Sequence, residues 1–170
     1  MDIILVNEKD EPIGAMGKIE VHQKALLHRA FSIFIFNGKN EMLLQKRAND
    51  KYHSPGLWTN TCCSHPRPGN DTLNEAVKRL NEEMGFTTEI KKVFDFIYKA
   101  VFDNGLTEFE FDHVFIGKYD GKISPNPAEV SDYCYRKMDD IHDDLLSHPQ
   151  RFTEWFKIAY PKVQKYLAAQ

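Results

Sequence analysis

Apolar positions along the chain follow two different periods, and the two periods predict a mixed sheet flanked by helices. Runs rich in β-branched and aromatic residues predict strands at 3–6, 14–21, 31–36, 41–46, 92–102, 108–119 and 130–137. The segment Asn37-Gly38-Lys39-Asn40 predicts a hairpin turn between the third and fourth of these strands. The expected fold class is therefore α+β, an α/β/α sandwich with a mixed β-sheet.

Helical spacing of apolar residues predicts three helices. Asp71 and Thr72 open the first and Gly85 stops it. Its apolar stripe consists of Leu73, Ala76, Val77, Leu80 and Met84. Residues 138–146 predict a short helix, and residues 151–169 predict a terminal helix. The terminal helix carries Phe152, Trp155, Phe156 and Ala159 along one side.

The connection from Arg47 to Asn70 is long and polar and contains Pro55, Pro66 and Pro68. Ordered loops of this length are usually functional, so we expect binding or catalytic residues here. The chain shows no internal repeat, low-complexity stretch or linker. These features predict a single domain over residues 1–170.

Composition narrows the class of protein. The chain has 170 residues, of which 42% are hydrophobic and 28% charged, as in soluble globular domains. Its net charge of −3 gives no electrostatic signature of nucleic acid or membrane binding. No signal-peptide pattern is present and the three cysteines form no disulfide framework, so we expect a cytoplasmic protein with reduced thiols. A monomer or homodimer is expected.

Two segments carry the side chains best suited to proton transfer. Cys63 and His65 lie in the polar run 59–66, and Glu108-Phe109-Glu110 follows further along the chain. Period two places both glutamates on one face of an apolar strand. Burial of two like charges there is unfavourable unless a cation or a shared proton is present. The sequence thus indicates a metal-assisted proton-transfer site.

Histidines supply further candidate ligands. His22, His28 and His65, together with the two glutamates, would form a five-ligand nitrogen and oxygen site. Such a set suits Zn²⁺, Mn²⁺ or Mg²⁺, and the ligands alone do not choose among them. We expect the other four histidines to be structural or surface residues: His53, His113, His142 and His148.

The end of the first predicted helix admits two interpretations. In the first interpretation, Glu82 and Glu83 belong to a solvated helix face whose charges are paired. This interpretation is favoured when the helix is considered alone. In the second, a carboxylate holds Mg²⁺ against a diphosphate. Arg47 and Lys51 support the second interpretation, because both lie in the preceding long connection and could clamp phosphate oxygens.

Residues 69–86 resemble a degenerate Nudix box. Glu82, Glu83 and Gly85 match its end, and Phe86 takes the last apolar position. Lys78 and Arg79 stand where the box has an Arg-Glu pair, and Asn70 falls at the first glutamate position. A Nudix hydrolase normally needs those glutamates to hold several Mg²⁺ ions. The loss of two of them argues against ordinary nucleoside-diphosphate hydrolysis.

From Ile3 to the final helix, the chain resembles the type 1 isopentenyl-diphosphate Δ-isomerases, a branch of the same fold. Four motifs in order carry the resemblance: Leu27-His28-Arg29-Ala30-Phe31-Ser32, Gln45-Lys46-Arg47-Ala48, Trp58-Thr59-Asn60-Thr61-Cys62-Cys63-Ser64-His65-Pro66 and Glu108-Phe109-Glu110. The resemblance implies a Nudix-like fold and interconversion of isopentenyl and dimethylallyl diphosphate, an isoprenoid-precursor step. The implied partner is the small isoprenoid diphosphate itself.

The resemblance also implies residue roles. Cys63 and Glu110 match the catalytic cysteine and glutamate, and Tyr98 matches a tyrosine near that glutamate. The ligands of the family's first metal site correspond to His22, His28, His65, Glu108 and Glu110. Glu83 matches the position that binds Mg²⁺ with the substrate diphosphate. The family's contacts to the substrate diphosphate correspond to Lys18, Arg47, Lys51 and Arg79. Trp155 matches the aromatic residue that faces the hydrocarbon end of the substrate.

Other interpretations of the same residues remain. Taken alone, Tyr98 and Trp155 suit a hydrophobic core, and Lys18 and Lys51 suit an ordinary surface. Most free cysteines are buried small hydrophobes, although the polar neighbours of Cys63 weaken that interpretation. At the level of function, the alternatives are a Nudix diphosphohydrolase and a non-catalytic Nudix-like binding domain.

Overall fold

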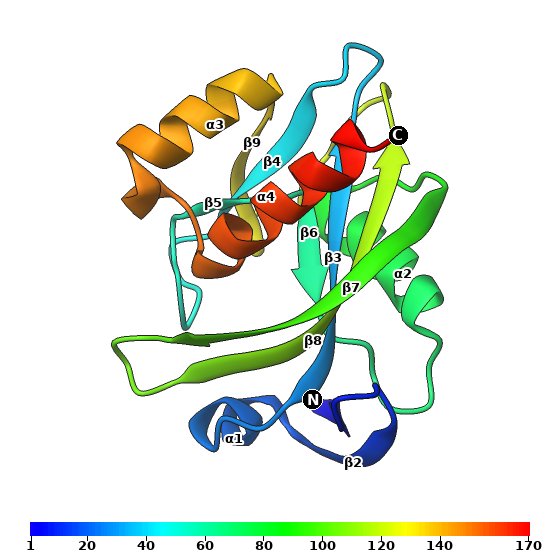
Figure 1. Cartoon of the computed structure of the whole chain (residues 1–170), viewed down its shortest axis with the longest axis vertical. Coiled ribbons are helices and arrows are strands. Elements are labelled where there is room, and N and C mark those ends of the chain that lie inside the picture. Colours follow the sequence, from blue (N-terminus) through cyan, green and yellow to red (C-terminus); the bar gives the residue numbers. More distant parts are fainter.

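The computed structural model describes residues 1–170 and contains one nine-stranded sheet with helices on both faces (Figure 1). The strands are β1 (Asp2–Val6), β2 (Pro12–Gly17), β3 (His28–Phe36), β4 (Met42–Arg47), β5 (Trp58–Thr59), β6 (Cys62–Ser64), β7 (Ile90–Val101), β8 (Thr107–Lys118) and β9 (Val130–Arg136). The helices are α1 (Lys18–Gln23), α2 (Thr72–Met84), α3 (Met138–Ser147) and α4 (Glu154–Ala168), with a 3₁₀ turn, η1, at Pro149–Arg151.

Strand β3 is the organising element of the sheet. It pairs antiparallel with β1, β4 and β6, and parallel with β8 over its whole length. Strand β8 pairs antiparallel with β7 in a long hairpin, and β4 pairs antiparallel with β5 and β9. The sheet is therefore mixed, as the sequence predicts.

Alternate side chains of β3 point into two separate hydrophobic layers. Phe31, Ile33 and Ile35 pack in one layer with Leu80 and Met84 of α2. The other layer joins Phe34 and Phe36 to Phe156, Ala159, Tyr160 and Val163 of α4 and to Ile141 of α3. Figure 1 shows α4 crossing one face of the sheet and α2 beyond the opposite face. Coverage of both faces explains why β3 is apolar throughout most of its length, and it confirms the predicted sandwich.

Helix α2 begins and ends at the residues that the sequence indicates. The Asp71 carboxylate caps its start by accepting a hydrogen bond from the Asn74 backbone N–H at 3.0 Å. Gly85 ends it with a left-handed φ of 74°. A Cβ atom at Gly85 would lie 2.1 Å from the Ser124 carbonyl oxygen. Only glycine fits there without displacing the neighbouring backbone.

The structure corrects the prediction at residues 14–21. Strand β2 ends at Gly17, and the following residues form the short helix α1. The Asp2–Gly17 pair is the last of the β1–β2 ladder, and the chain turns into α1 directly after it. The long connection after β4 also differs from a plain loop, because β5 and β6 lie within it. No helix of the structure is both long and apolar enough to cross a bilayer.

Candidate active site

Three neighbouring strands place Tyr98, Glu110 and His28 in one row across the sheet. Tyr98 of β7 lies directly opposite Glu110 of β8, and Glu110 is in register with His28 of β3. Residues in register on adjacent strands point to the same face. The period-two pattern of the sequence thus becomes a row of titratable side chains from three separate segments.

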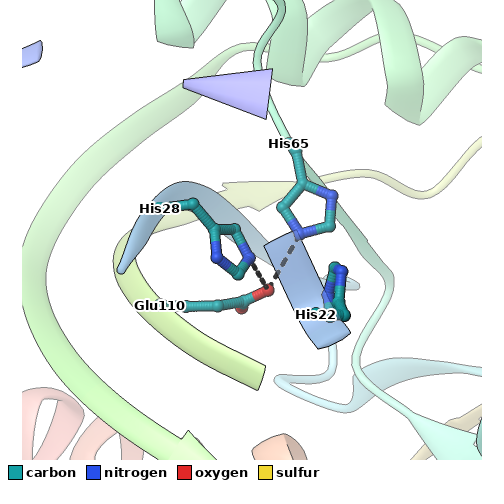
Figure 2. Close-up of side chains that lie close together, drawn as sticks. All are labelled: His22, His28, His65 and Glu110. Carbon is teal, nitrogen blue, oxygen red and sulfur yellow. Dashed lines mark hydrogen bonds and ion pairs between the residues drawn. The ribbon is translucent and has the colours of Figure 1, made fainter. Parts of the chain in front are cut away.

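A buried group consists of three histidines and one glutamate: His22, His28, His65 and Glu110 (Figure 2). His28 Nε2 lies 3.2 Å from Glu110 Oε2, and His65 Nε2 lies 2.9 Å from the same oxygen. His22 of α1 completes the group, and Figure 2 shows its ring close to the other two imidazoles. The four ligand atoms all lie within 4.8 Å of one another. Helix α1 is therefore what brings His22 to the site.

The chemistry of this group fits a divalent cation. His22 Nδ1 donates to the Lys18 carbonyl at 2.6 Å, which leaves its Nε2 as the free nitrogen. That Nε2 is buried and has no hydrogen-bond partner. Burial lowers the pKa of His22 and lowers that of His65 to about 3, so both imidazoles are neutral. Neutral imidazoles beside a carboxylate could bind a metal ion.

Tyr98 and Glu108 extend the row beyond Glu110. The Tyr98 hydroxyl oxygen lies 2.5 Å from Glu108 Oε1 and 2.5 Å from Glu110 Oε1. Burial, reinforced by the charge of Glu110, raises the pKa of Glu108. Burial also opposes ionisation of Glu110, but hydrogen bonds from His28 and His65 prevail and hold its pKa low. One carboxyl of the pair is protonated and the other ionised.

Cys63 reaches the same face from β6. It is in register with Ser32 of β3, and its thiol donates a hydrogen bond to Asn60 Oδ1 at 3.0 Å. The Ser32 hydroxyl lies 3.6 Å from the sulfur. Burial raises the pKa of Cys63, so the resting residue is a thiol. The adjacent Cys62 packs in the hydrophobic layer under α2. As expected, only one of the two thiols faces the pocket.

Buried polar groups connect Cys63 to the helix that carries Trp155. Thr59 Oγ1 donates to Asn60 Oδ1 at 2.9 Å, and Thr153 Oγ1 donates to Thr59 Oγ1 at 3.0 Å. Thr153 also caps α4 by accepting from the Phe156 backbone N–H at 3.3 Å. Trp155 follows the cap by two residues and lines the pocket. One hydrogen-bonded chain therefore fixes both the thiol and the aromatic ring.

Four cationic side chains line the pocket that contains Cys63, Tyr98, Glu110 and Trp155. They are Lys18, Arg47, Lys51 and Arg79. Burial lowers the pKa of Lys18, and the positive charges of Lys51 and Arg47 lower it further. Such mutual repulsion favours binding of an anion among these four side chains. The structure thus brings together every predicted diphosphate contact, none of which occupies an ordinary surface position.

Acidic side chains hold two of these cations in the free protein, and an aromatic ring lies against a third. Lys51 forms an ion pair with Glu129, and the Arg47 guanidinium lies 5.1 Å from the centre of the Trp155 ring. Arg79 donates to Glu83 Oε2 at 2.6 Å. The other oxygen of Glu83 accepts from Gln45 Nε2 at 3.0 Å. Glu83 thus lies in the pocket wall, outside the histidine group.

Comparison with known proteins identifies the family. Residues 26–156 match the NUDIX domain family. The curated isopentenyl-diphosphate Delta-isomerase of Pectobacterium atrosepticum is 45% identical over 168 residues, covering 99% of this chain and 94% of that protein. Isopentenyl-diphosphate Delta-isomerase 2 of Photorhabdus laumondii is 51% identical over 155 residues, covering 91% and 88%. The chain belongs to the isopentenyl-diphosphate Delta-isomerase family. The resemblance found in the sequence motifs is confirmed.

Solved structures show the same fold at lower identity. A Deinococcus radiodurans protein superposes with a TM-score of 0.80 at 13% identity, covering 95% of this chain and 98% of that one. The MutT protein of Methanosarcina mazei gives a TM-score of 0.67 at 16% identity, covering 82% and 94%. Because the sequence identity to these structures is low, the similarity supports the fold and not a shared function.

The pocket also contains residues whose place sequence reasoning missed. His53, expected to be structural or superficial, is buried and lines the pocket beside Glu108. Glu129, which directly precedes β9, and Gln45 of β4 also line the pocket. Asp112 does not line the pocket, but it is buried and accepts a hydrogen bond from Ser32 at 2.7 Å. Two of these residues had a sequence signal: Asp112 continues the period-two row of acids on β8, and Gln45 lies in one of the four motifs that carry the family resemblance.

Proposed function

We propose that this chain interconverts isopentenyl diphosphate and dimethylallyl diphosphate, with Cys63 and Glu110 as the two proton-handling groups. One observation carries the proposal. A protonated thiol, an ionised carboxylate, an indole ring and four cations all line a single pocket. This combination matches a substrate with a diphosphate at one end and an isolated double bond at the other.

The cationic wall would receive the diphosphate. Lys18, Arg47, Lys51 and Arg79 supply charge-assisted hydrogen bonds, and the guanidinium groups can bind phosphate oxygens in pairs. Binding would exchange the Glu129 partner of Lys51 for a phosphate oxygen. Because substrate and transition state carry the same diphosphate, these contacts mainly set affinity and position the hydrocarbon end.

The chemistry moves one double bond by two proton transfers. A proton adds to the terminal alkene carbon, the charge develops on the neighbouring tertiary carbon, and a proton leaves the carbon on its other side. An unactivated alkene is a very weak base, so the acid must be held close and water excluded. The Trp155 face would stabilise the cation by about 0.5–2 kcal/mol. Cys63 and Glu110 exchange roles when the reaction runs backwards.

The protein side chains indicate where two kinds of metal would be held. The proposed ligands of one divalent ion, Zn²⁺, Mn²⁺ or Mg²⁺, are His22, His28, His65 and Glu110, which form one group, and Glu108, which lies in a second group with His22. Glu83 is the proposed contact of Mg²⁺ that accompanies the diphosphate. When bound, the first ion would fix the orientation and lower the pKa of the glutamates, and the second would neutralise phosphate charge.

A Nudix diphosphohydrolase is the weaker candidate. Arg79 occupies a position at which the Nudix box has a metal-binding glutamate, and it forms ion pairs with both Glu82 and Glu83. A cation there opposes the clustering of several Mg²⁺ ions. A non-catalytic binding domain is weaker still, because it has no use for a buried thiol aligned with two buried carboxyl groups.

The setting of the enzyme follows from the same features. We propose that residues 1–170 act as one domain, because one sheet, the helices packed on it and their connecting loops together supply every residue of the pocket. The three cysteines are free, and the role given to Cys63 needs a reduced thiol. We therefore place the enzyme in the cytoplasm. A monomer or homodimer without nucleic acid or membrane partners stays a prediction.

Product analysis tests this proposal. The purified protein is incubated with isopentenyl diphosphate and divalent metal, and with a panel of nucleoside diphosphates in parallel. We expect dimethylallyl diphosphate from the first incubation and no phosphate from either. Phosphate release from the nucleotides, together with unchanged isopentenyl diphosphate, would favour the hydrolase instead.

A further inference from the structure

His53 is held next to the metal-binding residues although it comes from a different loop. It lies between β4 and β5, in the loop that follows Arg47 and carries Lys51. Its ring stacks on Phe102 at 5.0 Å with an interplanar angle of 8°, and it meets the edge of Trp155 at 5.6 Å. The Arg47 guanidinium donates to the His53 carbonyl oxygen at 3.2 Å. Ring and backbone are therefore both fixed.

The free nitrogen of His53 faces a buried carboxylate without bonding to it. Nδ1 lies 3.4 Å from the Ser54 hydroxyl, and Nε2 lies 3.6 Å from Glu108 Oε2. The second separation is too long for a good hydrogen bond. His22, whose Nε2 is buried and unpartnered, shares this space: the ligand atoms of His22, His53 and Glu108 all lie within 4.8 Å of one another.

These separations match those of ligands on a common ion. Two nitrogen or oxygen ligands about 2.1 Å from a metal lie about 3.0 Å apart when adjacent and about 4.2 Å apart when opposite. The 3.6 Å between His53 and Glu108 falls within that range. His22 belongs both to this set and to the set with His28, His65 and Glu110, so the two sets share one imidazole, although their six ligand atoms do not all lie within 4.8 Å of one another.

We propose that His53 is a fourth imidazole ligand of the divalent ion held by His22, His28, His65 and the two glutamates. This inference rests on the metal centre of the proposed function. The resulting six-ligand set, four nitrogens and two oxygens, suits a six-coordinate first-row transition ion. It disfavours tetrahedral Zn²⁺, which takes four ligands, and Mg²⁺, which prefers oxygen.

Ligation by His53 has a consequence for substrate binding. Its loop also contains Lys51, which lines the diphosphate wall two residues earlier in the chain. Besides the contact of Arg47 with the His53 carbonyl oxygen, the loop is held by the Asn104 side chain, which donates to the Tyr52 carbonyl oxygen at 3.1 Å. A bond from the ion to His53 would thus fix the Lys51 loop to the centre that orients Glu110.

Metal binding in the absence of substrate tests the inference independently of isomerase activity. Metal-stripped wild type, His53→Phe, His53→Gln and His142→Gln are titrated with Mn²⁺ against a chromophoric chelator. His53→Phe keeps the stack on Phe102 without a ligand atom, and His142 is exposed on α3 and serves as the control. Circular dichroism of each metal-free variant verifies folding.

We expect one ion per chain and four imidazoles around it by X-ray absorption in the wild type and in His142→Gln. Both His53 variants should retain three imidazoles and lose more than about 100-fold in affinity, beyond the 10–100-fold typical of outer partners. Metal should also slow amide exchange at residues 49–55 in the wild type but not in His53→Phe. Three imidazoles in the wild type, or an affinity that His53→Phe leaves unchanged, would overturn the proposal. Two ions per chain, with one lost in the variants, would overturn it as well.

Discussion

The Cys63 thiol is anchored by Asn60, whose Oδ1 accepts its hydrogen bond at 3.0 Å. The same oxygen accepts from Thr59, and the Asn60 amide donates to the Ile33 and Cys62 carbonyl oxygens, both at 3.0 Å. Asn60 is fully buried. A thiol held this way keeps one orientation relative to the pocket, which a proton transfer to or from a weakly basic alkene requires.

Thr153 is expected to affect both stability and catalysis, because it caps α4 and bonds to Thr59. Thr153→Val should lower the free energy of unfolding by about 1–2 kcal/mol through loss of the cap. It should also lower kcat several-fold, since Trp155 lies in the first turn of that helix. Thermal unfolding and steady-state kinetics measure the two effects. Thr153→Ser, which keeps the hydroxyl, should have a free energy of unfolding and a kcat close to those of the wild type. A destabilised Thr153→Val with wild-type kcat would show that the cap does not position Trp155.

Tyr98 is expected to matter through its hydroxyl alone, because that oxygen contacts both buried carboxyl groups. Tyr98→Phe should lower kcat about 100-fold, at the low end of general acid–base effects. It should also cost about 1–3 kcal/mol of stability, because buried carboxyl oxygens lose their partner. Tyr135→Phe is the control, since Tyr135 donates to the Tyr119 carbonyl oxygen on a strand away from the pocket. Equal kinetics for the two variants would argue against a role for Tyr98 in proton transfer.

Lys51 is expected to contribute to affinity rather than to chemistry. Lys51→Gln should raise KM about tenfold with a smaller change in kcat, because a charge-assisted hydrogen bond is worth about 1.5–3 kcal/mol and the Glu129 pair offsets part of it. Lys92→Gln, an exposed lysine paired with Asp95, is the matched control. A fall in kcat at constant KM would place Lys51 in the chemical step instead.

Glu75 on α2 gives the stability a definite pH dependence. Hydrogen bonds from Arg67 at 3.0 and 3.1 Å, and one from Asn70 at 2.9 Å, hold its pKa below the usual 4.5. A carboxyl with a lowered folded-state pKa stabilises the protein above the unfolded pKa, and this contribution disappears as pH falls through the folded value.

The variant Glu75→Gln should therefore lower Tm at pH 7 by about 2 °C, a small shift because Arg67 is exposed and water screens the pair. The difference from wild type should shrink as pH falls below 4.5. Glu89→Gln, at an exposed glutamate outside the ion pairs, should show no such trend. A Tm difference that is constant from pH 7 to pH 3 would contradict the assignment.

Sequence patterns predicted the elements whose conformation depends on residues close to one another in the chain. The hairpin at Asn37-Gly38-Lys39-Asn40 and the α2 boundaries at Asp71 and Gly85 depend on neighbouring residues, and both were predicted. The alternation on β8 likewise predicted that Glu108 and Glu110 share one face. Cys63 entered through its motif, and the structure places its side chain in the pocket.

Elements held by distant partners were not predictable in the same way. Strand β6 has three residues and exists because it pairs with β3, and α1 is a six-residue helix without a side-chain cap. Neither leaves a periodic signal, so residues 18–21 of α1 were predicted to continue a strand. His53 had no signal either, because its contacts with Glu108, Phe102 and Trp155 come from three separate parts of the chain.

The most direct test of the account follows isopentenyl diphosphate in deuterated water by NMR, with wild type, Cys63→Ala and Glu110→Gln side by side. Circular dichroism and metal content establish that each variant is folded and loaded. The wild type should form dimethylallyl diphosphate with deuterium at the carbon that gains a proton, and neither variant should form product. Isomerisation by Cys63→Ala or Glu110→Gln at close to the wild-type rate would contradict the assignment of these two residues as the proton-handling groups.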